Sequence, residues 1–262
     1  MGQFPRCSMA VSMTDRARRS RGEVQRHDDR HGENDDDARL QGVFIIRAMS
    51  IGFGRALRIV HRAFRGYPAR HRLHILIRFL TCPFTRTLDV IPVGARVLEI
   101  GAGHGVYALL ISTGRAREVV AVDPDLRKML LPTPSPRIRK VAGYENCIRG
   151  TFDAIVFYDT LYLIEVPDRP ALFASLYARL VPGGTLVLKD MDPSDRFKTS
   201  WARTQEELNT RFLHITTGSG FVHQTKEEVA ALLEAAGFVD FHARSVGRGY
   251  PHPHMLYTAR RP

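Results

Sequence analysis

The chain has 262 residues, enough for one large α/β domain or two small ones, and a chain of this length can bury about three quarters of its unfolded surface. Hydrophobic residues make up 44% and charged residues 25% of the sequence, which excludes a chain that is disordered throughout. No apolar run approaches the ~20 residues that a membrane-spanning helix needs. The net charge of +11 makes nucleic acid, an anionic membrane surface and an acidic carrier the partners to consider.

The excess positive charge lies in one segment. Residues 1–40 hold eight arginines and eight acidic residues, residues 41–96 hold ten arginines against Asp89 alone, and residues 97–262 hold 20 basic and 18 acidic side chains. The three segments therefore carry net charges of 0, +9 and +2. Arginine outnumbers lysine 33 to 5 over the whole chain, so general composition accounts for part of this excess.

Residues 1–40 are expected to be a disordered tail or sequence upstream of the true start. Within them, residues 14–39 mix charged and polar side chains with a single large aliphatic residue, too little apolar area to offset the entropy of ordering. The amino terminus lacks the apolar stretch of a secretory signal. Cys7, Cys82 and Cys147 form no CxxC pair, which suits reduced thiols, so a cytoplasmic location is expected.

Residues 41–93 are predicted to form a basic helical lid. Apolar residues recur at three- and four-residue steps over residues 45–67, with arginines between them, which is the pattern of an amphipathic helix. Gly52 and Gly54 weaken that helix. A second helix is expected within residues 68–83, between a proline that suits a helix start and one that suits a helix stop.

From residue 94 onward, short β-rich runs alternate with helical ones, which predicts βαβ units and a parallel, doubly wound sheet. A polar stretch at residues 191–222 interrupts the alternation. The expected strands are 96–100, 118–122, 138–141, 152–158, 185–189, 239–246 and 255–260, and the expected helices are 106–114, 125–131, 170–180 and 226–236.

The most informative segment is Val97-Leu-Glu-Ile-Gly-Ala-Gly-His-Gly105, whose glycines come directly after a predicted strand and before a predicted helix. Its three glycines allow a tight turn and let a cofactor approach the backbone without a Cβ in the way. The dinucleotide-binding fingerprint needs glycine or alanine where this chain has Val106, so the segment disfavours an NAD-binding site. Glu99 suits a ligand with a positively charged end and is a poor neighbour for a pyrophosphate.

This segment resembles motif I of the class I S-adenosylmethionine-dependent methyltransferases, and the resemblance extends over residues 94–262. Three further motifs follow in the order and spacing of that family: Ala121-Val-Asp123, Phe152-Asp-Ala-Ile-Val-Phe-Tyr158 and Leu180-Val-Pro-Gly-Gly-Thr-Leu-Val-Leu188. The resemblance implies an α/β fold with a doubly wound, mostly parallel seven-stranded sheet, S-adenosylmethionine as cofactor, and the helical lid in front of the methyltransferase domain.

The resemblance also implies roles for residues of the first motif. Gly101, Ala102 and Gly103 would pack against the methionine part of the cofactor, and Gly105, the last glycine of the loop, belongs to the same cofactor-binding set. Glu99 would hold the cofactor's ammonium or the amides of the loop itself.

Further roles fall after the later strands. Asp123 would accept hydrogen bonds from both ribose hydroxyls. The alternative is that Asp123, directly before Pro124, is a helix cap. Glu145 is the nearest candidate for the adenine end, although the segment around it departs from the family pattern. Tyr158 lies at the carboxyl end of the fourth strand, where open α/β sheets bind ligands.

Methyl transfer is an in-line displacement, and a base is needed only if the acceptor is protonated. Asp159, His252 and His254 are the candidate catalytic residues. For the two histidines, the alternative is a solvated turn or a packing role. No metal site is expected.

The acceptor is expected to be a small molecule, a lipid-like molecule or an acyl-carrier-bound group. Methylation of DNA bases is disfavoured, because Asp159-Thr-Leu-Tyr162 stands where DNA enzymes of this fold carry a Pro-Pro-aromatic segment. The lid and the insertion at 191–222 would form the acceptor pocket. We hypothesise that the basic lid meets an anionic membrane surface or an acidic carrier; alternatively, its apolar face simply packs on the domain.

Two other function classes stay open at the level of sequence. One is an NAD-binding Rossmann oxidoreductase. The other is a non-catalytic member of the methyltransferase fold.

Overall fold

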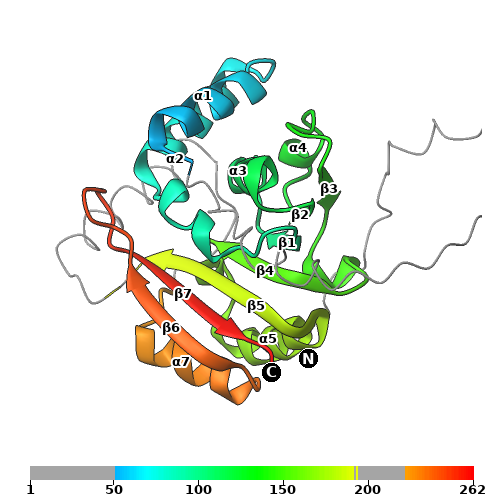
Figure 1. Ribbon diagram of the computed structural model, residues 1–262, viewed down its shortest axis with the longest axis vertical. Helices are drawn as coiled ribbons and strands as arrows, with labels where there is room; N and C mark the ends of the chain where they lie inside the picture. Colours follow the sequence, from blue (N-terminus) through cyan, green and yellow to red (C-terminus); the bar gives the residue numbers. More distant parts are fainter. Residues whose placement is uncertain (1–50, 192, 194–221) are drawn as a thin grey trace, which may run out of the picture.

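A computed structural model describes residues 51–191, 193 and 222–262 of the chain (Figure 1). The predicted tail at residues 1–40, residues 41–50 of the predicted lid, and most of the predicted insertion lie outside the described residues.

Seven strands form one sheet in the order β3-β2-β1-β4-β5-β7-β6. β7 runs antiparallel to its neighbours β5 and β6, and the other paired strands are parallel, which confirms the predicted doubly wound, mostly parallel seven-stranded sheet. The strands are β1 (Arg96–Ile100), β2 (Glu118–Asp123), β3 (Ile138–Ala142), β4 (Phe152–Tyr158), β5 (Leu180–Met191), β6 (Val239–Ser245) and β7 (His254–Arg260).

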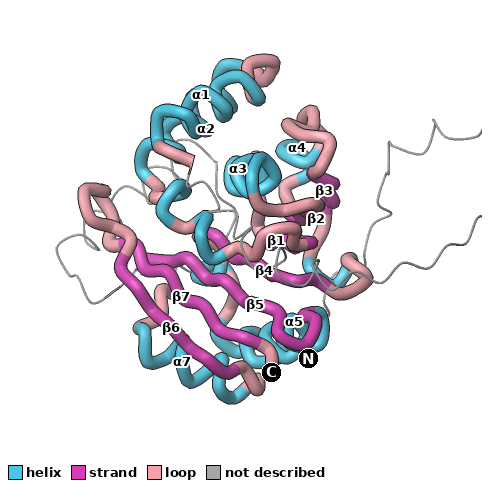
Figure 2. Tube along the Cα trace, viewed as in Figure 1, coloured by secondary structure: helices cyan, strands magenta, loops and turns pink. Residues whose placement is uncertain are grey.

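Helices cover both faces of the sheet (Figure 2). On one face, apolar side chains of α3 (Val106–Gly114) and of the lid pack on alternate residues of the central strands, such as Val97 and Ala154. On the other face, α5 (Arg169–Arg179) and α7 (Lys226–Ala235) pack on the intervening residues, such as Leu98 and Ile155. The central strands are therefore buried on both sides, as their continuous apolar runs predict.

Within residues 94–262, two elements differ from their predicted bounds by more than one residue. The strand expected at residues 185–189 begins at Leu180, because Leu180 pairs with Phe152 of β4. The register then shifts between Phe152 and Ala154, and Gly183 and Gly184 exchange backbone hydrogen bonds with Arg261. The helix expected at 125–131 is the short α4 (Leu126–Met129), which the side chain of Asp125 caps by accepting the backbone N–H of Arg127.

The lid comprises α1 (Phe53–Ala63) and α2 (Ala69–Thr81), followed by the short turns η1 (Phe84–Arg86) and η2 (Leu88–Val90). The described part of the helix expected at 45–67 is shorter than predicted: it begins after Gly52 and ends at Ala63. Val60 in α1, with Phe64 and Tyr67 after it, is buried against the domain. The apolar face of the first helix therefore packs inward.

Candidate functional site

The glycine loop lies at the edge of the sheet where the parallel strands end. Gly101, Gly103 and Gly105 all adopt positive φ, at +71°, +56° and +80°. The backbone N–H groups of Gly101 and Ala102 both donate to the carbonyl of Val122, at 2.9 and 3.1 Å, which ties the loop to the end of β2. The turn therefore needs glycine at these positions, as predicted, since residues with a side chain rarely adopt a positive φ.

The first two glycines differ in what surrounds them. A Cβ on Gly101 would lie 2.3 Å from both Cγ2 and Oγ1 of Thr160, whereas a Cβ on Gly103 would meet no atom within 4 Å. Gly101 is therefore required by the close approach of Thr160, and Gly103 leaves the backbone open to a ligand. Thr160, two residues past β4, was not identified from the sequence, because only the fold brings it to the loop.

Asp123 connects the glycine loop to the start of α4. Its Oδ2 accepts the backbone N–H of Gly103 at 2.7 Å, and its Oδ1 accepts the backbone N–H of Asp125 at 2.8 Å. The cap of α4 is Asp125, so the alternative role of Asp123 as a helix cap is wrong. Asp123 instead holds the glycine loop and the backbone just before that helix. Because an ionised carboxylate offers about four acceptor sites, both oxygens keep capacity for ligand hydroxyls.

Glu99 is a buried carboxyl at the end of β1 with an unsatisfied oxygen. Its side chain is almost fully buried, and Oε2 has no hydrogen-bond partner in the described part of the chain. Burial, reinforced by the charge of Asp123, raises the pKa of Glu99 to about 8. At neutral pH the carboxyl is therefore mostly protonated, and a nearby cation would favour its ionised form.

Asp159, directly after β4, is held between two cations. Its carboxylate accepts from the buried ammonium of Lys189 in β5 and forms an ion pair with the guanidinium of Arg78 in α2 at 2.9 Å. Its backbone has φ of +55°, a strained conformation for a residue other than glycine. Together Lys189 and Arg78 hold the pKa of Asp159 well below its usual range despite burial.

This geometry does not fit the predicted role of Asp159 as a general base. A carboxylate that two cations stabilise in its ionised form is a weak proton acceptor. Its position instead anchors the lid to the sheet, because Arg78 belongs to α2. Neither cation was identified as a site residue from the sequence, although a lysine directly after the apolar run Leu186-Val-Leu188 of β5 is a signal that could have been noticed.

Tyr158, predicted near the cofactor, lies in an aromatic cluster beneath the lid. Its ring is 4.7 Å from that of Phe84 in η1 and 4.7 Å from that of Tyr107 in α3, measured between centroids. The ammonium of Lys189 lies 5.1 Å from the ring centroid. Tyr158 therefore contributes to packing between lid and sheet.

The two candidate histidines, His252 and His254, lie close enough to Asp159 for its charge to act on the pKa of both. His254, the first residue of β7, is buried, and its Nε2 is 2.9 Å from the carbonyl oxygen of Thr81 at the end of α2. Since a carbonyl only accepts, Nε2 carries the proton and Nδ1 keeps the lone pair. Burial, with the charge of Lys189, lowers the pKa of His254 to about 3, and burial also lowers that of His252.

The turn that contains Glu145 is tied to the same edge. The turn η3 (Glu145–Cys147) follows β3, and just before it the N–H of Gly143 donates to the carbonyl of Asp123 at 3.0 Å. Glu145 itself is half-buried. Contact between Glu145 and an adenine stays a prediction.

A second link between lid and loop is made by histidines. Nδ1 of His71 in α2 lies 2.9 Å from Nε2 of the buried His104 in the glycine loop, and the ring of His74 packs on His104 at 5.2 Å. No group of three or more His, Cys, Asp or Glu side chains among the described residues is arranged to hold a metal ion.

Comparison with known proteins identifies the fold and the family. The profile of the "Methyltransferase domain" family matches residues 70–243, about two thirds of the chain. The chain belongs to the methyltransferase domain family. This match favours methyl transfer over the NAD-linked alternative.

Curated relatives of this methyltransferase-family chain share limited identity with it. Phosphoethanolamine N-methyltransferase of Triticum aestivum is 26% identical over 168 residues, covering 61% of this chain and 31% of the relative. Carboxy-S-adenosyl-L-methionine synthase of Trichodesmium erythraeum is 22% identical over 149 residues, covering 53% and 57%. The chain thus spans about a third of the first relative and somewhat over half of the second.

Solved structures support the same fold. A cyclopropane synthase from Mycobacterium tuberculosis superposes with a TM-score of 0.53 at 15% identity, covering 68% of this chain and 82% of that one. Human N-acetylserotonin methyltransferase in complex with SAM also gives 0.53, at 17% identity, covering 84% and 59%. At these identities the likeness concerns the fold alone.

Proposed function

We propose that the protein transfers a methyl group from S-adenosylmethionine to a small-molecule, lipid-like or carrier-bound acceptor. The observation that carries this proposal is the glycine loop between two buried carboxyls, Glu99 and Asp123, with open space at Gly103. The unsatisfied oxygen of Glu99 suits an ammonium, and the remaining capacity of Asp123 suits hydroxyls. Membership of the methyltransferase domain family supports the same cofactor.

In this proposal the protein acts mainly by holding and enclosing the reactants. When bound, the cofactor supplies an electrophilic methyl group on a sulfonium, which the acceptor attacks in line. Asp123 would hold the ribose and Glu99 the ammonium, while Gly101, packed on Thr160, keeps the loop in one conformation. The lid, anchored by Arg78, excludes water from this edge.

Asp159 and His254, two of the predicted catalytic residues, are weak bases. Asp159 is paired with Lys189 and Arg78. His254 keeps a lone pair on Nδ1, but its pKa of about 3 makes it a poor proton acceptor at neutral pH. We therefore favour an acceptor whose nucleophilic atom needs no strong base from the protein, with His254 as the candidate for any proton that is released.

The charges around Asp159 favour an acceptor with an anionic group. Two cations, Arg78 and Lys189, surround one carboxylate, so the cluster holds one positive charge in excess. About a third of the Arg78 side chain (34%) is exposed, and its guanidinium has five N–H donors. A carboxylate or phosphate on the acceptor would balance this charge, and an isolated ammonium would be repelled by it.

This proposal predicts where methyl label should go. We expect label from methyl-labelled S-adenosylmethionine, incubated with the protein and fractionated cell extract, to enter a product that an anion exchanger retains. The variant Arg78→Gln should lower that incorporation at least tenfold and leave affinity for S-adenosylhomocysteine unchanged. Arg72→Gln, an exposed arginine on the same helix, is the matched control. Labelled product that the exchanger does not retain would contradict the anionic acceptor, and absence of any transfer would contradict the function.

The raised pKa of Glu99 predicts pH-dependent cofactor binding. Because its pKa is about 8 in the free protein and an ammonium would lower it in the complex, binding of S-adenosylhomocysteine at pH 7 should release a proton. Affinity should therefore rise with pH and level off above about 8. Calorimetry in buffers of different ionisation enthalpy measures the proton count. Glu99→Gln should abolish the release; unchanged release in this variant would refute the assignment.

A further inference from the structure

We propose that the outer face of α2, with the groove between α1 and α2, is a docking surface for an anionic lipid bilayer. This surface is separate from the glycine loop, and the proposal holds whichever acceptor is methylated. We call it the lid face and define it by Leu73, Leu76, Ile77 and Leu80 of α2 and by the groove described below.

A row of apolar side chains on α2 is exposed. Leu73, Leu76, Ile77 and Leu80 follow the i, i+3, i+4, i+7 spacing of one helical face, and their exposed fractions are 59%, 42%, 48% and 47%. Ile75 and Phe79 of the same helix are buried, so α2 already has a separate face toward the domain. Single exposed apolar residues are ordinary, but a continuous row of this kind is typical of an interaction surface.

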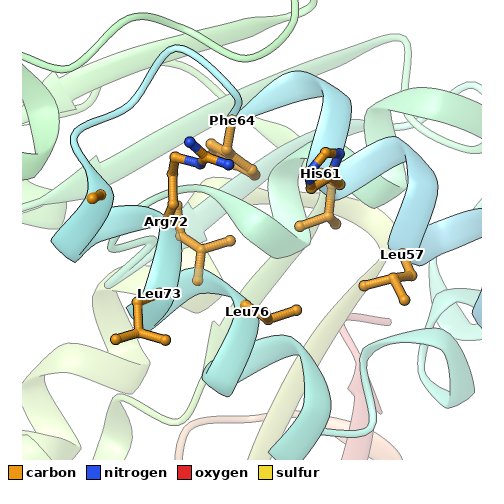
Figure 3. Close-up of a pocket in the computed structure, with 9 residues that line it drawn as sticks. Leu57, His61, Phe64, Arg72, Leu73 and Leu76 are labelled. Carbon is orange, nitrogen blue, oxygen red and sulfur yellow. The ribbon is translucent and has the colours of Figure 1, made fainter.

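An apolar groove continues this row toward α1. Its volume is about 400 Å³, and it is lined by side chains of both helices, among them Leu57 and Phe64 of the α1 segment and Leu73 and Leu76 of α2 (Figure 3). His61 and Arg72 are the ionisable side chains among its lining residues. A groove of this size and polarity suits a segment of an acyl chain.

The charge around the lid face is uniformly positive. Residues 51–88 contain eight arginines and no aspartate or glutamate. Six of these arginines are exposed and form no ion pair with any described residue: Arg55, Arg58, Arg62, Arg65, Arg70 and Arg72. Exposed apolar residues beside unpaired arginines are the two features of a helix that lies in the interface of an anionic membrane.

The same charges argue against a second copy of the chain as the occupant. Two lid faces brought together would place two sets of unpaired arginines side by side, and like charges in contact are unfavourable. The inference also narrows the sequence hypothesis, which rested on the arginine excess and the apolar stripe of the whole lid. Val60 and Phe64 of the first helical segment are buried, and the exposed apolar row belongs to α2.

Vesicle flotation of the full chain tests the proposal. We expect binding to vesicles of equimolar phosphatidylglycerol and phosphatidylcholine at low salt, and at least tenfold weaker binding to pure phosphatidylcholine. The double variant Leu73→Gln/Ile77→Gln should weaken binding to the anionic vesicles at least tenfold. Its control is Val166→Gln/Val239→Gln, which changes two apolar residues of similar exposure, 46% and 45%, outside the lid.

Thermal melts with and without S-adenosylhomocysteine establish that each variant is folded, and light scattering reports self-association. Equal loss of vesicle binding in both double variants would overturn the proposal, as would wild-type binding that is absent or indifferent to lipid charge. Self-association of the wild type that Leu73→Gln/Ile77→Gln abolishes, or salt-sensitive binding to an acidic carrier protein without binding to vesicles, would also overturn it.

Discussion

Gly101→Ala is expected to destabilise the protein by about 2–5 kcal/mol and to abolish its binding of S-adenosylmethionine. An alanine at φ of +71° costs about 1–2 kcal/mol. Its Cβ would lie 2.3 Å from Thr160, and such overpacking adds about 1–3 kcal/mol. Since the loop cannot keep its position, the cofactor loses the backbone it would lie against. Urea unfolding and calorimetric titration measure the two effects.

A double-mutant cycle separates the clash from the backbone strain. Thr160→Gly removes the side chain that the new Cβ would meet, so Gly101→Ala should cost less in the Thr160→Gly background than in the wild type. The part that is not recovered is the cost of positive φ. An equal cost of Gly101→Ala in both backgrounds would contradict the contact between Gly101 and Thr160.

Asp123→Ala is expected to weaken binding of S-adenosylhomocysteine at least 100-fold. Hydrogen bonds to a charged group are worth about 1.5–3 kcal/mol each, and in our proposal the ribose donates two of them to this carboxylate. The variant also releases the N–H of Gly103, which the carboxylate holds at 2.7 Å. Calorimetric titration measures the affinity, and the unfolding transition reports whether the fold persists.

Asp125→Ala is the matched control for Asp123→Ala. Asp125 lies two residues further on and caps α4 by accepting the N–H of Arg127 at 3.1 Å. Its loss should cost about 1 kcal/mol of stability and change the affinity little. If the two variants weaken binding equally, the effect of Asp123→Ala reflects the turn before α4, and the ribose assignment is wrong.

The strands and helices that an apolar run in the sequence marks out by itself were predicted well. The strands at Arg96–Ile100 and Phe152–Tyr158 and the helix at Val106–Gly114 have the predicted bounds, because apolar runs bounded by glycines or polar residues specify them directly. The start of β5 was missed, since Pro182 and its glycines suit a turn. The strand begins at Leu180 because Leu180 pairs with Phe152, and residues 181–184 form an irregularity in the strand in which Gly183 has a positive φ. Tertiary pairing overrode local propensity there.

The candidate site was predictable on the cofactor side and much less so on the lid side. The glycines and Asp123 lie within one βαβ unit, so their spacing in the sequence reports their spacing in the fold. The cluster of Arg78, Asp159 and Lys189 joins three distant segments, and no local pattern reports such a contact. Asp159 was therefore assigned as a base from its place after β4, although its partners make it an anchor.

For the lid, the sequence did not predict which apolar face is exposed. Periodicity identifies an apolar face but does not say whether that face is covered. Val60, Phe64 and Tyr67 in and after α1 are buried against the domain, and the row on α2 is exposed, although both helices repeat apolar residues at similar spacing. Only the packing of α1 beside α3 distinguishes them.

The central claim is that the edge of the sheet between Glu99 and Asp123 binds S-adenosylmethionine. Calorimetric titration of the wild-type chain with S-adenosylhomocysteine, repeated in the presence of excess NADH, tests it most directly. We predict one binding site per chain that NADH does not affect. Absence of binding, or displacement by NADH, would contradict the account.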